Sequence, residues 1–372
     1  MFTGGLAAIG VLAVVGMLTG LSIGLKLRAA AAMQHSCPPG YSKDNVDVTF
    51  FVIGDWGRKG NSNQMRAADL MGQIGACMPP DFVVSTGDNF YPSGLRSATD
   101  PGFTNTFTNV YTHPSLQVPW YGVLGNHDYG DQLGSSEVRG LHAAPTLEGC
   151  LSQDDCFSPI WQAGGGLASR DVRWHAQQGV TTRSVSLGAT GQTLDLIMLD
   201  TSPLIPRYRS KAWAVIHGGV GSFNASLLLE QSLAAISSSS AAWKLVVGHH
   251  PVRSAGEHCS DPGKSDCAVM LGLLQSGLAS AGVAAYFNGH DHDLQLIKAA
   301  GDPVYYVVSG AGSDVREGEF AHLPDDLLTD HDFFADDQGF VAAAISGDTL
   351  TLSFYTSRVA GPAHTVDIPR KA

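Results

Sequence analysis

Five short strings, each joining a glycine to a side chain that can bind a metal, constrain this 372-residue chain more than any other feature. In chain order they are Gly54–Gly57, Gly87–Tyr91, Gly125–Asp128, Gly248–Pro251 and Gly289–His292. Four directly follow an apolar, strand-like run, and Asp88 follows such a run after Thr86. Open α/β sheets bind ligands beyond the carboxyl ends of their strands, so these side chains should meet at one sheet edge. Hard oxygen donors together with imidazoles are typical of hydrolytic sites with two metal ions.

The apolar runs alternate with helical patterns, which predicts an α/β fold with mixed sheets. We expect helices over 62–76, 222–237 and 268–280. We expect strands over 46–53, 81–85, 119–124, 181–187, 193–199, 243–247, 283–287, 304–308, 340–346, 349–355 and 363–368. The glycine-rich stretch 130–166 is expected to be a long loop, and the acidic stretch 325–337 an exposed loop. With no short internal repeat and no sign of a second domain, the sequence predicts one catalytic domain over residues 46–372, preceded by a linker over 33–45.

The N-terminal segment carries a long apolar run. Residues 2–25 contain no charged side chain and are long enough to span a bilayer. Lys26 and Arg28 follow, and then alanines occupy 29–32. Residues 1–32 are therefore expected to be either a cleaved signal peptide or an N-terminal membrane anchor. Charges on the downstream side would turn that side of an anchor toward the cytosol.

Cysteine usage favours an oxidising compartment instead. The chain has six cysteines and no C-x-x-C zinc pair. Two local pairs, Cys150–Cys156 and Cys259–Cys267, lie in polar, loop-like stretches and are predicted disulfides. Cys77 lies in an apolar segment and is expected to be an unpaired core residue. With a glycosylation sequon at Asn224, these features predict a secreted, lumenal or cell-surface protein.

The polar residues of the five strings form a ligand set rather than isolated turn residues. A single aspartate beside a glycine, such as Asp55 or Asp88, is often a turn or helix cap. Here two of them share a pattern with an asparagine, a tyrosine and several histidines. His290 and His292 are two apart, so an extended segment directs both imidazoles to one face. The sequence therefore indicates a metal cluster.

The order of the strings resembles that of the purple acid phosphatases, which belong to the calcineurin-like metallophosphoesterases. It is most similar to the small tartrate-resistant type, and the likeness extends to Val118–Tyr121, Met198–Thr201 and Ser309–Gly312. It covers residues 46–370. The resemblance implies an α+β sandwich, with two mixed β-sheets flanked by helices in the four-layer metallophosphoesterase architecture.

The resemblance also implies the role of each site residue. A ferric ion would be held by Asp55, Tyr91, His292 and a bridging Asp88. A divalent ion (iron, zinc or manganese) would be held by Asp88, Asn126, His249 and His290. His127 and His258 match the two catalytic histidines that face the substrate. Asp128, Asp291 and Trp56 are expected to support or pack around the site without a catalytic role.

The implied activity is that of an acid phosphatase, which hydrolyses phosphate monoesters with metal-bound hydroxide. Asp55, Asp88 and a Tyr91 phenolate carry about three negative charges against about five positive charges on the ions, which leaves about two to attract phosphate. Small phosphorylated substrates or phosphoproteins are the expected partners. The net charge of −12 disfavours nucleic acid, because phosphate backbones need Lys and Arg to neutralise them. We expect a monomer.

Two departures from the family pattern leave other functions open. His250 stands where the family usually has tyrosine, and 130–166 is longer than small members need. One alternative is a phosphodiesterase or nucleotidase that uses other metals on the same fold. Another is an iron-binding or redox protein, which would need no substrate-facing histidines. The presence of both His127 and His258 argues against it.

Overall fold

The computed structural model describes residues 35–371, except 39, 135, 139–147, 149–155, 189–190, 261–265 and 319–332. Residues 35–372 form one compact unit. The predicted signal or anchor segment lies outside the described residues, so the division of residues 1–45 stays a prediction. In the part that is described, no helix is both long and apolar enough to cross a membrane.

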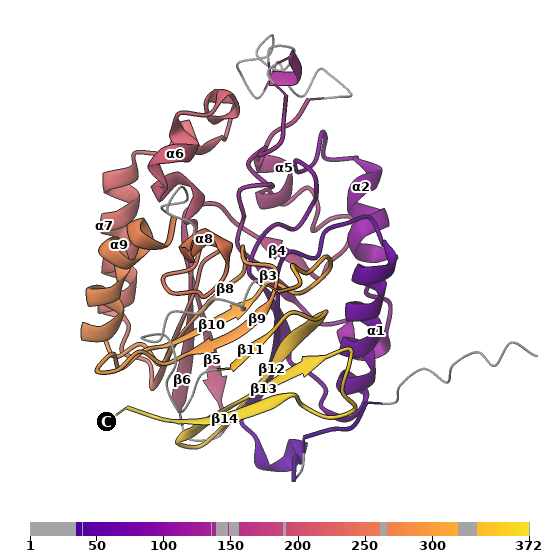
Figure 1. The fold of residues 1–372 in the computed structure, drawn as a ribbon, viewed down its shortest axis with the longest axis vertical. Coiled ribbons are helices and arrows are strands. Elements are labelled where there is room, and N and C mark those ends of the chain that lie inside the picture. The colour runs from indigo at the N-terminus through magenta and orange to yellow at the C-terminus, as the bar shows by residue number, and fades with distance from the viewer. Residues whose placement is uncertain are drawn as a thin grey trace, which may run out of the picture. The chain divides into compact units, whose positions relative to one another are not determined.

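Two mixed β-sheets lie at the centre of the compact unit (Figure 1). The first has the order β14 (His364–Pro369), β13 (Thr349–Thr356), β12 (Gly339–Ser346), β1 (Val48–Ile53), β2 (Phe82–Ser85), β3 (Trp120–Gly122) and β4 (Trp174–Ala176). The second has the order β11 (Phe333–Ala335), β9 (Leu294–Ile297), β10 (Tyr305–Ser309), β8 (Ala285–Asn288), β7 (Trp243–Val247), β6 (Gln192–Leu199) and β5 (Val180–Leu187). Central strands run parallel, as β1 with β2 and β7 with β8. Their carboxyl ends therefore lie at one edge of each sheet.

Both faces of the central strands are buried, because the sheets pack on each other and on helices. In β1, Phe50 and Val52 belong to an apolar cluster built from strands of both sheets. Their neighbours Phe51 and Ile53 belong to a second cluster, together with Met71 of α1. This two-residue alternation places one face of β1 between the sheets and the other under a helix. The predicted fold, with two mixed sheets between helical layers, is confirmed.

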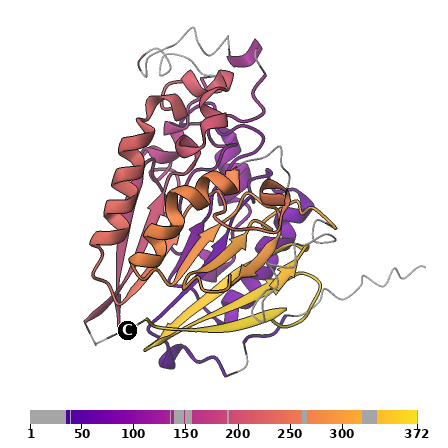
Figure 2. The ribbon, with the colours of Figure 1, turned by 60° about the vertical axis from the view of Figure 1, so that its left-hand side comes forward.

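Helices cover the outer faces of the sheets. Figures 1 and 2 show α7 and α9 together on one side of the strands, and Figure 1 shows α1 and α2 on the other. The helices are α1 (Ser62–Cys77), α2 (Pro101–Phe103), α5 (Ile160–Ala163), α6 (Pro206–Arg209), α7 (Ala225–Ser238), α8 (Glu257–Ser260) and α9 (Asp266–Ser280). The side chain of Asn61 caps α1, and that of Asn224 caps α7. The three predicted helices are confirmed with small shifts at their ends.

The structure corrects several predictions. Cys77 is not an unpaired core residue, because it forms a disulfide with Cys37. Phe333–Ala335, predicted to lie in a loop, forms the edge strand β11 against β9. Strands β4 and β9 were not predicted either. The Cys259–Cys267 disulfide is confirmed, whereas Cys150 and a part of the 130–166 insertion lie outside the described residues.

Candidate metal centre

The candidate ligands lie just past the carboxyl ends of the central strands of both sheets. Asp55, Asp88 and Asn126 follow β1, β2 and β3 of the first sheet. His249 and His290 each come two residues after β7 and β8 of the second. Asp55, Asp88 and His290 have positive φ values of 58°, 52° and 72°. This region is unfavourable for residues other than glycine, and such strain concentrates at functional sites.

The glycines of the strings allow the ligand loops to pack closely. A Cβ atom on Gly289 would overlap the carboxylate of Asp55, and one on Gly125 would overlap that of Asp88. Each glycine therefore removes a side chain from the space that a ligand of another string occupies. Glycine is thus required at these two positions because the ligand loops approach each other closely.

Three of the candidate ligands meet around the hydroxyl of a fourth, Tyr91. Its oxygen lies 3.1 Å from Asp55 Oδ1, 3.0 Å from Asp88 Oδ2 and 3.0 Å from His292 Nε2. A phenol has one proton, so it can donate to only one of these three groups. Two carboxylate oxygens, a phenol oxygen and an imidazole nitrogen gathered this closely fit a bound cation. We call Asp55, Tyr91 and His292 the first half of the centre.

The remaining ligands form a second half, made of Asn126, His249 and His290. His249 Nε2 lies 3.1 Å from Asn126 Oδ1, 3.5 Å from Asp88 Oδ2 and 3.2 Å from His290 Nδ1. The other nitrogen of His249, Nδ1, donates to the carbonyl of Thr86 at 2.9 Å, which leaves Nε2 as the unprotonated nitrogen. Asp88 thus touches both halves, as a bridging ligand must. The structure brings together all seven predicted ligands.

The electrostatics of the centre suit a cation. Burial opposes ionisation of Asp88, but His249 and His127 outweigh it and lower the pKa of this carboxyl. Burial also disfavours protonated His249, yet the Asp88 and Asp55 carboxylates raise its pKa. Burial, with Asp88 and Asp55, raises the pKa of the Tyr91 hydroxyl well above its usual value. A Tyr91 phenolate therefore requires a positive charge in the centre.

The two predicted catalytic histidines flank the ligands. The ring of His127 lies 4.4 Å from that of Tyr91, and its Nδ1 donates to the carbonyl of Pro92 at 2.6 Å. The ring of His258 lies 3.7 Å from that of His290. Its Nδ1 lies 2.7 Å from Asp291 Oδ1. Each histidine thus has its Nδ1 engaged with the protein, and Nε2 remains for a substrate.

Two aspartates without an assigned catalytic role organise the site. Asp128 accepts the backbone N–H groups of Asn89, Phe90 and Gly125, which ties the Asp88 loop to the Asn126 loop. Asp291 accepts from His258 and from Ser254. Burial opposes its ionisation, but these hydrogen bonds outweigh burial and lower its pKa. Asp128 and Asp291 both lie inside the ligand strings, and this position is what indicated a supporting role for them in the sequence.

His250, the departure from the family pattern, is fully buried beside the second half. One nitrogen each of His249, His250 and His290 lie within 4.8 Å of one another. However, His250 Nδ1 is 2.8 Å from Thr201 Oγ1 and its Nε2 is 3.2 Å from Tyr208 Oη. Both nitrogens therefore have partners within the protein, and His250 supports the ligands rather than joining them. Sequence reasoning assigned no role to Thr201, although it lies in a stretch that resembles the family, and it missed Tyr208.

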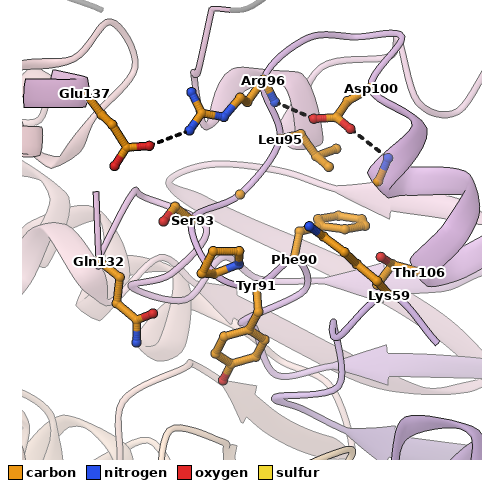
Figure 3. A pocket seen from close by; sticks show the side chains of 13 residues that line it. Lys59, Phe90, Tyr91, Ser93, Leu95, Arg96, Asp100, Thr106, Gln132 and Glu137 are labelled. Carbon is orange, nitrogen blue, oxygen red and sulfur yellow. Dashed lines mark hydrogen bonds and ion pairs between the residues drawn. The ribbon is translucent and has the colours of Figure 1, made fainter. Parts of the chain in front are cut away.

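A pocket of about 380 Å³ opens beside Tyr91 (Figure 3). Figure 3 shows Tyr91 at one edge of it, with Arg96, Asp100 and Glu137 across the opposite side. Arg96 pairs with Glu137 at 2.8 Å, and Lys59 also lines the pocket. The pocket shares Tyr91 and Pro92 with the surroundings of the metal centre, which places room for a bound molecule next to the ligands.

Comparisons with known proteins agree with this site. The family model for calcineurin-like phosphoesterases matches residues 48–294. Purple acid phosphatase 4 of Arabidopsis thaliana is 36% identical over 343 residues, with 90% of this chain and 86% of that protein covered. Tartrate-resistant acid phosphatase type 5 of Mus musculus is 28% identical, with 89% of this chain and 92% of that protein covered.

Two solved structures share the fold. GAP50, the anchor in the inner membrane complex of Plasmodium, has a TM-score of 0.64 at 20% identity and covers 88% of this chain and 90% of its own. Purple acid phosphatase PPD1 from yellow lupin seeds has a TM-score of 0.56 at 15% identity, covering 87% of this chain and 54% of its own. The purple acid phosphatase relatives imply a dinuclear metal centre, which the two halves of the site fit. The chain therefore belongs to the calcineurin-like phosphoesterases, and within them to the purple acid phosphatases.

Proposed function

We propose that the protein is an acid phosphatase that hydrolyses phosphate monoesters at a ferric–divalent centre. The ferric ion would be held by Asp55, Asp88, Tyr91 and His292, and the divalent ion by Asp88, Asn126, His249 and His290. The observation that carries the proposal is the Tyr91 hydroxyl, 3.0–3.1 Å from two carboxylates and an imidazole. A phenolate is a hard anionic oxygen donor, and it suits a hard, highly charged ion such as ferric iron.

The protein's own contribution is to place protons and charge around the phosphate. When bound, the metals supply Lewis-acid charge for phosphate oxygens and acidify a water molecule. His127 and His258 each have Nδ1 engaged with the protein, so both present Nε2 to a substrate. Protonated at Nε2, they would stabilise charge on the phosphate or protonate the leaving alcohol. The Asp291 carboxylate, 2.7 Å from His258 Nδ1, holds the ring so that Nε2 faces away from it.

The surroundings support a small phosphorylated substrate. The pocket beside Tyr91 gives room for a leaving group, and its Arg96–Glu137 pair leaves it without a strong net charge. We propose small phosphorylated molecules or phosphoproteins as substrates of a monomeric enzyme. An exported location, secreted, lumenal or on the cell surface, is supported by the Cys37–Cys77 and Cys259–Cys267 disulfides.

The visible spectrum of the purified protein, recorded beside its metal content, tests the proposal. Wild type should show a broad phenolate-to-iron band, and Tyr91→Phe should lose it. Tyr111→Phe is the matched control, because Tyr111 is a buried tyrosine packed on Trp120 at 4.5 Å, outside the ligand set. Rates on phosphate mono- and diesters separate the phosphatase from a phosphodiesterase. A colourless protein with two metals and no iron would contradict the ferric assignment.

A further inference from the structure

Asp266, the first residue of α9, has a fully buried carboxylate that contacts the metal-ligand candidate His290 from behind. Its Oδ2 lies 3.2 Å from His290 Nε2. The opposite nitrogen, Nδ1, faces His249 and the rest of the second half. We propose that Asp266 is a positioning residue that keeps the proton of His290 on Nε2, so that Nδ1 is free for the divalent metal. This inference rests on the proposed function, because it requires a metal in the second half.

A chain of hydrogen bonds determines which groups donate a proton toward Asp266. It begins at Thr201, whose hydroxyl oxygen accepts the backbone N–H groups of His249 at 3.2 Å and His250 at 3.1 Å. Because these two bonds use the lone pairs of the oxygen, the Thr201 proton must be donated elsewhere. Its acceptor is His250 Nδ1, at 2.8 Å.

His250 passes the same order of donor and acceptor on to Tyr208. With Nδ1 as an acceptor, a neutral imidazole has its proton on Nε2 and donates it to Tyr208 Oη, at 3.2 Å. Arg207 donates to the same oxygen at 2.9 Å. Tyr208 therefore donates its own proton onward, to Asp266 Oδ2 at 3.2 Å. A histidine fits position 250 because it accepts on one side and donates on the other.

Asp266 is thus surrounded by donors. Arg207 Nε donates to Oδ1 at 2.6 Å, and a terminal nitrogen of Arg207 contacts Oδ2. A carboxylate whose oxygens meet the guanidinium of Arg207 and the hydroxyl of Tyr208 in this way acts as an acceptor. The contact of Oδ2 with His290 therefore requires a proton on Nε2. Such carboxylate–histidine–metal arrangements fix the tautomer and strengthen the ligand.

The local disulfide anchors this arrangement. Cys259 and Cys267, eight residues apart, are bonded to each other. Each directly follows a residue of the site, His258 in one case and Asp266 in the other. One covalent link therefore restrains both the carboxylate behind His290 and the histidine whose ring stacks on it.

Metal affinity tests the inference directly. The second site is emptied by dialysis against a chelator, and Zn²⁺ is titrated back by calorimetry while the visible band monitors the first half. Asp266→Ala should weaken Zn²⁺ binding about 10–100-fold, the usual effect of losing such a partner, and leave the band intact. The matched control is Asp171→Ala, which removes a partly buried aspartate that is also paired with an arginine, Arg173 at 2.6 Å, and should bind Zn²⁺ like wild type.

Variants of the chain separate tautomer control from simple packing. His250→Leu should weaken Zn²⁺ binding about tenfold, whereas His250→Gln, which retains a donor toward Tyr208, should recover most of it. Arg207→Gln, at a partly exposed side chain, tests the same carboxylate if Asp266→Ala fails to fold. Zn²⁺ affinities within twofold of wild type in Asp266→Ala or Arg207→Gln would overturn the inference. A wild type that binds no second metal would instead overturn the proposed function.

Discussion

The two halves of the metal centre are supported by neighbours of opposite charge. In the first half, the guanidinium of Arg58 lies 3.9 Å from the centre of the Tyr91 ring. In the second half, the carboxylate of Asp266 lies against His290. A cation stabilises a phenolate ligand, and an anion strengthens an imidazole ligand. The negatively charged phenolate thus has a positive neighbour, and the imidazole, which donates a proton, has a carboxylate neighbour. Because the two supporting residues differ, a substitution can alter one half without altering the other.

The largest effect is expected where the halves join. Asp88→Asn removes a carboxylate that contacts both Tyr91 and His249, so both ions should be lost or weakly held. Phosphatase activity should fall by roughly 10³-fold or more, since metal charge contributes several kcal/mol to such reactions. Metal analysis beside kcat/KM measures this. Retention of two tightly bound metals in Asp88→Asn would show that the halves are independent and that Asp88 is no bridge.

Removing a substrate-facing group should leave both halves intact. His258→Ala should lower kcat by about 10²–10⁴-fold, the usual contribution of a general acid, with the metal content of wild type. His175→Ala is the control, because His175 is an exposed histidine on β4 that stacks on Tyr121. Loss of the second metal from His258→Ala would mean that its stacking on His290 supports the ligand, and that His258 is not primarily an acid.

The convergence of the candidate ligands could be predicted from sequence, whereas the residues behind them could not. Asp55, Asp88, Asn126, His249 and His290 each follow a strand beside a glycine, and that pattern is local. Arg58 follows the first string by one residue, but nothing in the sequence indicates that it stacks on Tyr91. Asp266 is 24 residues from His290, and only the packing of α9 brings them together.

The incorrect predictions have the same origin. Cys77 looked like a core residue because its helix is apolar, yet its partner Cys37 is 40 residues away. The strand Phe333–Ala335 is defined by its pairing with β9 rather than by any pattern of its own. Local periodicity therefore predicted the long elements, while contacts between distant segments decided the rest.

A smaller effect, confined to the first half, is expected from Arg58→Met. Removal of the positive charge above the Tyr91 ring should raise the energy of the phenolate electrons and move the iron band to longer wavelength. Zn²⁺ affinity of the second half should not change. Arg66→Met is the control, because Arg66 donates to Gln338 at 2.8 Å, away from the ligands. An unmoved band would show that the stacked guanidinium does not tune the phenolate.

A substitution at Asp200, next to Thr201 behind the second half, is expected to have the smallest effect on the metal centre. Its main effect is expected on the pH dependence of the protein's stability. Burial raises the pKa of Asp200 from 3.8 to about 7, although the Tyr129 hydroxyl and the N–H of Gly179 donate to it. The folded protein therefore binds a proton that the unfolded chain releases above pH 3.8. Its contribution to stability is complete below that pH and is lost as the pH rises toward about 7.

Asp200→Asn should flatten this dependence. The melting temperature of wild type should fall between pH 5 and pH 7, and that of Asp200→Asn should fall less, by a difference of a few degrees. Asp302→Asn is the contrasting control: burial opposes ionisation of Asp302, but hydrogen bonds from Val304 and Gln275 outweigh it and lower its pKa, so its contribution is lost only at more acidic pH. Equal slopes for wild type and Asp200→Asn would mean that Asp200 is already ionised at pH 5. Asp200 would then add a buried negative charge behind the second half, and the support of this half would be still more unlike the Arg58 cation of the first half.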